Sequence, residues 1–194
     1  IVNLIDKKKI IKMSKRAGNF ILLSEVVDCI GKDALRFFML IRKNDAHLDF
    51  DLEKCLEETK ENPVFYVQYA YARINSIKRL VREKKLLKSE DDNNSVNLIN
   101  TEQEINIIKT LSIWPRIIES SVFYREPHRV VFYLIELAST FHSFWNMGNS
   151  DSKYKILCED NIELTRARLT LMEAVKAVLE NGLNILSIEP VEKM

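Results

Sequence analysis

Residues 62–74 read NPVFYVQYAYARI and open the longest helical signal in the chain. Pro63 stands in the first turn, where a proline is tolerated, and the helical pattern continues to about residue 85. Only four glycines and four prolines occur in 194 residues, whereas Leu, Ile, Glu and Lys are frequent. The chain is therefore predicted to be mainly α-helical.

Three further helices are predicted downstream, at residues 101–120, 127–145 and 162–181. Thr101 and Glu104 form a capping-box pattern at the start of the first helix, and Pro115 should kink or interrupt it. Gly182 is expected to end the third helix. An apolar segment, residues 185–191, should then pack back on the resulting bundle.

The segment before residue 59 mixes strand and helix signals. Residues 1–5 and 10–11 are β-branched runs around a polar turn, which predicts a hairpin. Ser24 is expected to cap one short helix that Gly31 closes, and Asp51 is expected to cap another. The predicted fold class is therefore mainly α: a helical bundle preceded by a small α/β portion.

No metal site is predicted. His47, Asp49 and Asp51 are close in sequence, but interleaved Leu48 and Phe50 favour an extended or turning connector over a metal cluster. The cysteines are three, widely spaced and without a Cys-x-x-Cys pair: Cys29, Cys55 and Cys158. This pattern is typical of reduced thiols in the cytosol. Apolar runs are short and broken by charge, so no membrane segment is expected.

The charges nearly cancel, with 29 basic and 28 acidic residues, but their distribution is uneven. Six basic residues and no acid lie between Lys7 and Arg16, and seven lie between Arg73 and Lys88 against Glu83 alone. Such blocks suit a polyanion, although a solvated face would look the same. Four cations of the long helix are predicted to lie on roughly one face: Arg73, Lys78, Arg79 and Arg82.

The first basic block contains a candidate phosphate-binding loop, residues 12–19, which read KMSKRAGN. Its lysine, serine and arginine side chains offer hydrogen-bond donors to a polyphosphate. Gly18 and Asn19 tolerate the positive φ that a tight loop needs. The alternative is a plain basic surface turn that follows a strand.

Residues 12–15, KMSK, match the second ATP-site motif of class I aminoacyl-tRNA synthetases. Further segments occur in the same order as in one branch of that class: GNF (18–20), DALRFF (33–38), HLDFD (47–51), residues 62–74 and the ending 182–194. The whole chain thereby resembles bacterial arginyl-tRNA synthetases. Arg16 departs from the commonest form of the motif, which has serine at that place.

The resemblance implies two domains: residues 1–58 would be the end of the catalytic domain, and residues 59–194 a helical anticodon-binding domain. The family joins arginine to ATP as arginyl-adenylate and then transfers arginine to its tRNA. ATP with Mg²⁺ would be a substrate, with no permanently bound cofactor. A cytoplasmic monomer is expected, and the chain alone should be inactive because the family's other ATP motif and its arginine pocket lie upstream of residue 1.

The resemblance also implies site residues. The residues that would bind ATP are Lys12, Met13, Ser14 and Lys15. Of these, Lys12 and Lys15 would be catalytic. The candidates for tRNA binding come from two helices and the end of the chain: Tyr69, Arg73, Phe141, His142, Trp145, Asn146 and Met194. Tyr69 and Arg73 are expected to brace the helix and touch the RNA backbone, whereas Trp145 either packs in the core or stacks on an anticodon base.

Two alternatives remain open at this point. The chain could be the tail of another class I synthetase, such as a cysteinyl one. It could also be a helical RNA-binding or scaffold module with no catalysis.

Overall fold

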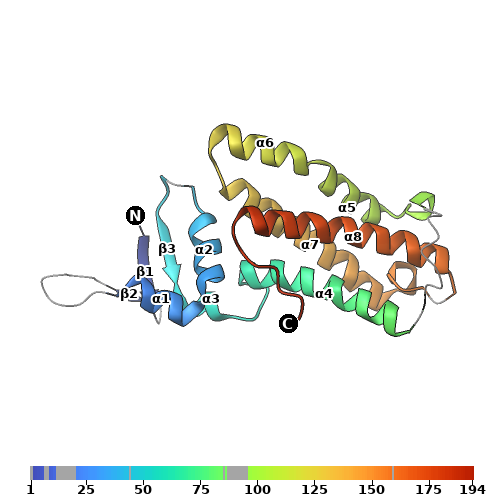
Figure 1. Ribbon diagram of the computed structural model, residues 1–194, viewed down its shortest axis with the longest axis horizontal. Coiled ribbons are helices and arrows are strands. Elements are labelled where there is room, and N and C mark those ends of the chain that lie inside the picture. The colour runs from blue at the N-terminus through green and yellow to red at the C-terminus, as the bar shows by residue number, and fades with distance from the viewer. Residues whose placement is uncertain are drawn as a thin grey trace, which may run out of the picture.

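A computed structural model describes residues 2–6, 9–11, 21–43, 45–84, 86, 96–158 and 160–194. It has two parts: a small sheet with three short helices, and a bundle of longer helices (Figure 1). The predicted class, mainly α with a small α/β portion, is confirmed. The basic loop at residues 12–19 lies outside the described residues.

The small part is built on a three-stranded sheet with the order β2-β1-β3. Strands β1 (Val2–Asp6) and β2 (Lys9–Ile10) pair antiparallel, which confirms the predicted hairpin. The expected connector forms strand β3 (Leu48–Asp51), which pairs parallel with β1. Helices α1 (Leu23–Ile30), α2 (Lys32–Leu40) and α3 (Leu52–Leu56) complete this part. Its core consists of Leu4, Val26, Ile30, Leu35, Leu48, Phe50 and Cys55.

The ends of these short helices follow local chemistry. The Asp51 carboxylate accepts hydrogen bonds from the backbone N–H groups of Glu53 (3.1 Å) and Lys54 (3.4 Å), so the predicted cap of α3 is confirmed. The predicted cap at Ser24 is wrong, because α1 begins at Leu23. The carboxylate of Glu25 instead reaches back to the Leu22 N–H at 2.8 Å.

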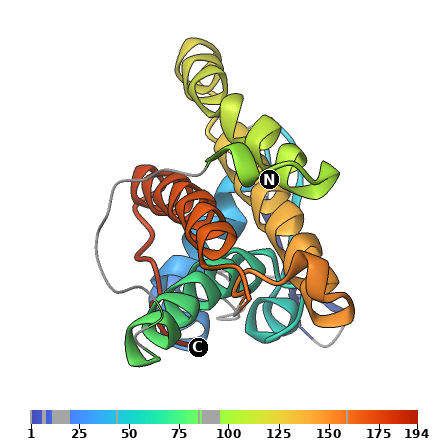
Figure 2. The same cartoon turned by 90° about the vertical axis from the view of Figure 1, so that its right-hand side faces the viewer.

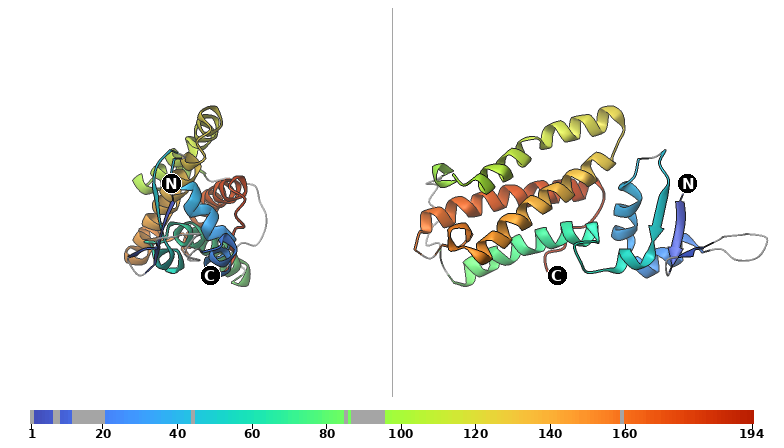
Figure 3. Two further views of the ribbon diagram at one scale, coloured as in Figure 1. Left: turned by 90° about the vertical axis from the view of Figure 1, so that its left-hand side faces the viewer. Right: turned by 180° about the vertical axis from the view of Figure 1, so that it is seen from behind.

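The bundle contains α4 (Pro63–Glu83), α5 (Glu102–Ser112), α6 (Trp114–Tyr124), α7 (His128–Ser150) and α8 (Ile162–Ile185). Two 3₁₀ turns accompany them, η1 (Val96–Leu98) and η2 (Ser152–Tyr154). Helix α7 contacts α4, α5, α6 and α8, and the end-on view in Figure 2 shows these neighbours around it. Helix α2 contacts α4 and α7, so it lies between the sheet and the bundle, as Figure 3 shows from behind.

Two sequence signals set the ends of the bundle helices. Asn62 caps α4 by accepting from the N–H groups of Val64 (3.2 Å) and Phe65 (3.4 Å). The capping box of Thr101 and Glu104 is confirmed at the start of α5. The expected interruption before Pro115 is also confirmed: α5 ends at Ser112 and α6 starts at Trp114.

Two predicted helix ends are wrong, and both involve a glycine. Helix α7 continues beyond residue 145 to Ser150, through Gly148. Helix α8 continues through Gly182 to Ile185. A Cβ atom on Gly182 would lie 2.5 Å from Cδ2 of Leu134 in α7. Gly182 therefore serves the close approach of α8 to α7 and not the end of a helix.

A Gly182→Ala change should destabilise the protein by about 1–3 kcal/mol, because the added methyl group must displace the Leu134 side chain in a packed interface. Urea unfolding followed by circular dichroism measures this change. Asn181→Ala, at the exposed neighbouring position, is the control and should stay within about 0.5 kcal/mol. An alanine at position 182 that stabilised the protein would show that helix propensity outweighs packing there.

The residues after α8 return to the bundle as predicted, since the side chains of Leu186 and Ile188 are buried in its core. None of the described helices is long and apolar enough to cross a membrane.

Candidate functional site

Arg73 of α4 lies at the centre of an aromatic cluster between α4 and α7. Its guanidinium carbon is 4.2 Å from the ring centre of Tyr69 and 4.9 Å from that of Trp145. Its Nη2 atom donates a 2.6 Å hydrogen bond to the Tyr69 hydroxyl. Tyr69 is one helical turn before Arg73, so the two side chains share a face of α4. The cluster thus combines a fixed positive charge with two aromatic rings.

His142 of α7 contacts the guanidinium of Arg73. Its Nδ1 atom is 3.2 Å from Nη1 of Arg73, and its Nε2 atom is 3.1 Å from the backbone oxygen of Tyr66. Because a guanidinium can only donate, Nδ1 must accept and Nε2 must carry the proton. Burial, with a smaller effect of the Arg73 charge, lowers the pKa of His142 to about 4, although the bond to Tyr66 acts the other way. His142 is therefore neutral at pH 7.

The predicted tRNA-binding residues differ in exposure. Phe141 and His142 are buried, at 0% and 4% exposed, so neither side chain is available for direct contact with RNA. Both support half-buried members of the set: the ring centre of Phe141 lies 6.4 Å from that of Trp145, and the ring of His142 stacks on Tyr69 at 5.6 Å. Trp145 is half-buried. Asn146 and Met194 are exposed.

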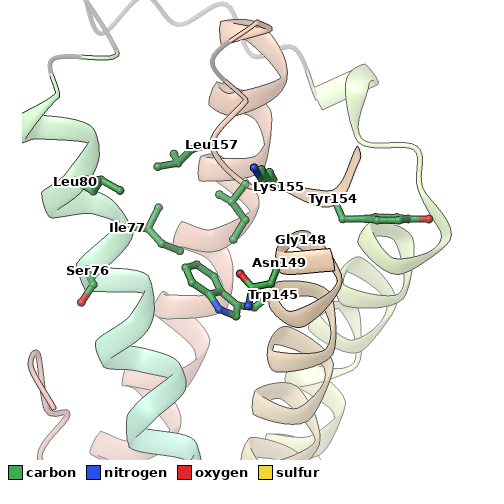
Figure 4. A pocket seen from close by; sticks show the side chains of 10 residues that line it. Ser76, Ile77, Leu80, Trp145, Gly148, Asn149, Tyr154, Lys155 and Leu157 are labelled. Carbon is green, nitrogen blue, oxygen red and sulfur yellow. The ribbon is translucent and has the colours of Figure 1, made fainter. Parts of the chain in front are cut away.

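A cleft of about 480 Å³ opens beside Trp145, between the later turns of α4 and α7 and the η2 segment (Figure 4). Its lining includes the Trp145 indole and the polar residues Asn149 and Lys155, whereas the side chain of Ser76 points away from Trp145. Gly148 allows this arrangement, because a Cβ there would lie 2.9 Å from the backbone oxygen of Tyr154. The cleft thus offers an aromatic wall, apolar sides and hydrogen-bonding groups, which is the chemistry that an unstacked base requires.

These polar lining residues were not predicted from the sequence. Helical spacing could have found one of them, since Asn149 follows Trp145 by four residues. Lys155 lies in the turn after α7, where no periodic signal exists.

The four cations of α4 do not share one face, which corrects the prediction. Arg73 faces α7, whereas Lys78 pairs with Glu173 of α8 at 2.5 Å. Five residues advance an α-helix by about 140° beyond a full turn, which explains the separation. The Arg79 side chain points in a third direction from α4. Its guanidinium donates to the Ser76 hydroxyl (2.6 Å) and to the Glu192 backbone oxygen (3.2 Å).

Within the part of the chain that the structure describes, no group of three or more His, Cys, Asp or Glu side chains could hold a metal ion. The predicted ATP residues Lys12, Met13, Ser14 and Lys15 all fall in residues 12–20, outside the described residues.

Comparison with known proteins identifies a matching family and curated relatives. The family described as the DALR anticodon binding domain matches residues 67–194. The chain is 46% identical over 200 residues to an arginine-tRNA ligase of Rickettsia felis and 47% identical over 198 residues to one of Azorhizobium caulinodans. Each match covers all of this chain and 34% of the relative, so the chain spans about a third of the length of these curated relatives.

Solved structures show the same fold. A protein described as an arginyl-tRNA synthetase from Campylobacter jejuni is 29% identical and superposes with a TM-score of 0.79, covering all of this chain and 40% of that one. The arginyl-tRNA synthetase of Thermus thermophilus superposes with a TM-score of 0.65 at 22% identity, over 93% of this chain and 29% of that one.

Proposed function

This chain belongs to the DALR anticodon binding domain family, and on that premise we propose that it is the tRNA-binding part of an arginine-tRNA ligase. The whole protein would form arginyl-adenylate from arginine and ATP and transfer arginine to its tRNA. The resemblance to arginyl-tRNA synthetases in the sequence is confirmed by relatives that cover the entire chain. The two alternatives, a cysteinyl tail and a non-catalytic RNA-binding module, have no such support.

The cluster of Tyr69, Arg73 and Trp145 is the observation that carries the proposal. Single-stranded RNA is bound where bases stack on aromatic faces and cations meet the phosphates. The guanidinium between two rings supplies both parts at one place. The adjoining cleft has room for a base that leaves the stack, because its volume is about 480 Å³.

Each predicted residue then has a role in this proposal. Trp145 is the stacking surface, and Tyr69 and Arg73 meet the backbone of the anticodon loop. Asn146 and Met194 would add contacts to the RNA from exposed positions. Phe141 and His142 act indirectly, by fixing the rings from the buried side.

The division of the chain follows from the same proposal. Residues 1–58 would complete the catalytic domain, and residues 59–194 would be the anticodon-binding domain. Two hydrophobic clusters support the division: one lies in the sheet part, and the other consists of bundle residues together with Phe37 of α2. The match to the family also begins only at residue 67. The ATP loop at Lys12–Lys15 would belong to the first domain and would bind ATP with Mg²⁺ as a substrate. We place the enzyme in the cytoplasm as a monomer.

Trp145→Ala should weaken binding of an arginine tRNA transcript by about 10-fold, which is the typical loss for one stacked base. Fluorescence anisotropy of the labelled transcript measures it, with a second transcript whose anticodon bases are changed. The variant should also lose its preference between the two transcripts. Phe123→Ala removes an aromatic ring that is 79% exposed on α6 and serves as the control. An unchanged preference in Trp145→Ala would remove Trp145 from the site.

A further inference from the structure

The carboxyl-terminal tail, residues 186–194, is attached to α4 by the buried amide of Gln68. The Gln68 Nε2 atom donates to the backbone oxygen of Glu189 at 2.7 Å, and its Oε1 atom accepts from the backbone N–H of Val191 at 2.9 Å. Gln68 is only 4% exposed. One side chain thus satisfies two backbone groups of the tail, as a neighbouring strand would do.

Helix α2 holds the beginning of the same tail. Arg36 donates to the backbone oxygen of Leu186, and the Lys32 ammonium pairs with the Glu189 carboxylate at 2.7 Å. The Lys32 and Glu189 side chains are well exposed, so this ion pair adds little stability. Beyond Glu189, the part-buried bonds to Gln68 join the tail to α4.

The tail runs along α4. After Gln68 binds residues 189 and 191, Arg79 donates to the backbone oxygen of Glu192, eleven residues further along the helix. The same guanidinium donates to the Ser76 hydroxyl, which Figure 4 shows on the side of α4 away from Trp145. Figure 1 shows the end of the chain beside α4. Met194, 55% exposed, is two residues beyond this bridge.

We propose that Gln68 is a positioning residue that fixes the tail against α4. It thereby places Met194 on the surface that binds RNA in the proposed function. The inference rests on the proposed function. A segment outside the helices and strands is ordered only where it is tied down, and a disordered segment must be ordered when the RNA binds. Gln68 removes that cost in the free protein, so it acts on RNA affinity through the tail and without touching RNA.

The first measurement tests the attachment alone. Gln68→Met keeps the side-chain volume and removes both hydrogen bonds. Hydrogen exchange of the Val191 amide, followed by NMR without RNA, should become at least ~10-fold faster, because that N–H loses its acceptor. Gln103→Met makes the same chemical change in α5 and should leave Val191 protected.

The second measurement tests the effect on RNA. Gln68→Met should weaken binding of the arginine tRNA transcript by about 10-fold, the size of one lost base contact. In a chain shortened to end at Ile188, the same substitution should change affinity by less than about twofold, because the tail through which it acts is gone. A purely structural role of Gln68 would weaken binding equally in both backgrounds.

Two results would overturn the inference: an equal loss in both backgrounds, or an unchanged affinity when Val191 has lost its protection. A different result bears on the proposed function. If the unmodified chain did not prefer arginine tRNA over other tRNAs, that function would be wrong, whereas the exchange of Val191 would still report whether Gln68 holds the tail.

Discussion

Replacing Arg168 by methionine is expected to lower the free energy of unfolding by about 3–5 kcal/mol, since it leaves a buried carboxylate without its charged partner. Arg168 in α8 is 2% exposed, and its Nε atom donates to the Glu104 carboxylate at 2.6 Å. Glu104 is fully buried. Its other carboxylate oxygen accepts from the Thr101 hydroxyl at 2.7 Å and the Thr101 N–H at 2.9 Å.

The pKa of Glu104 shows that the pair is well compensated. Burial by itself would raise this pKa, but the hydrogen bonds from Thr101 and Arg168 outweigh burial and lower the pKa below its usual value. The carboxylate therefore stays charged, and its desolvation is offset only while Arg168 is present. Arg168 also donates to the backbone oxygen of Lys155 at 2.6 Å and so ties the segment after α7 to α8.

Guanidinium chloride unfolding, followed by circular dichroism and fluorescence, measures the effect of Arg168→Met and tests whether the transition is two-state. The double variant Glu104→Gln with Arg168→Met is the decisive control. It should recover part of the loss, because no unpaired charge remains. If the single variant lost less than about 1 kcal/mol, water would have to reach Glu104, and the pair would not be the buried bridge described above.

Lys15→Ala is expected to lower the rate of arginyl-adenylate formation by about 10²–10³-fold in the protein that joins this chain to the catalytic portion of its relatives. Negative charge grows on the departing pyrophosphate during attack on the α-phosphate. A lysine on a loop that closes over the nucleotide stabilises that transition state more than the ground state. This expectation rests on the KMSK motif, because residue 15 is outside the described residues.

Arginine-dependent exchange of labelled pyrophosphate into ATP measures this rate for Lys15→Ala. Lys9→Ala is the matched control, because Lys9 belongs to the same basic block but precedes the motif. A small effect of Lys9→Ala beside a large one of Lys15→Ala would assign the chemistry to the motif and not to the overall charge. Near-normal exchange in Lys15→Ala would refute the assignment.

Features that depend on neighbouring residues could be predicted from the sequence. Asp51 caps α3 and Thr101 caps α5, because a cap needs only a side-chain oxygen and the next few N–H groups. The interruption before Pro115 has the same local origin. Features that depend on distant contacts could not. The pairing of β3 with β1 joins residues 46 apart, and Gly182 is explained by Leu134, 48 residues away.

The predictions for the candidate site differ in success for the same reason. The resemblance to a family selected Tyr69, Arg73 and Trp145, and the packing of α4 on α7 brings them together. Exposure could not be read from the sequence, so Phe141 and His142 were grouped with exposed residues although both are buried. The Arg168–Glu104 pair was missed as well, since Glu104 matched a capping pattern that needs no partner 64 residues away.

On the proposed function, the arrangement around Arg73 has a consequence for the kinetics of RNA binding. The guanidinium is already held by Tyr69, His142 and Trp145 when no RNA is present, so it keeps its place when RNA arrives. Complexes that form without rearrangement associate at rates set mainly by diffusion and by charge. If the proposed function holds, correct and incorrect anticodons should therefore associate at similar rates and differ in how long each stays bound.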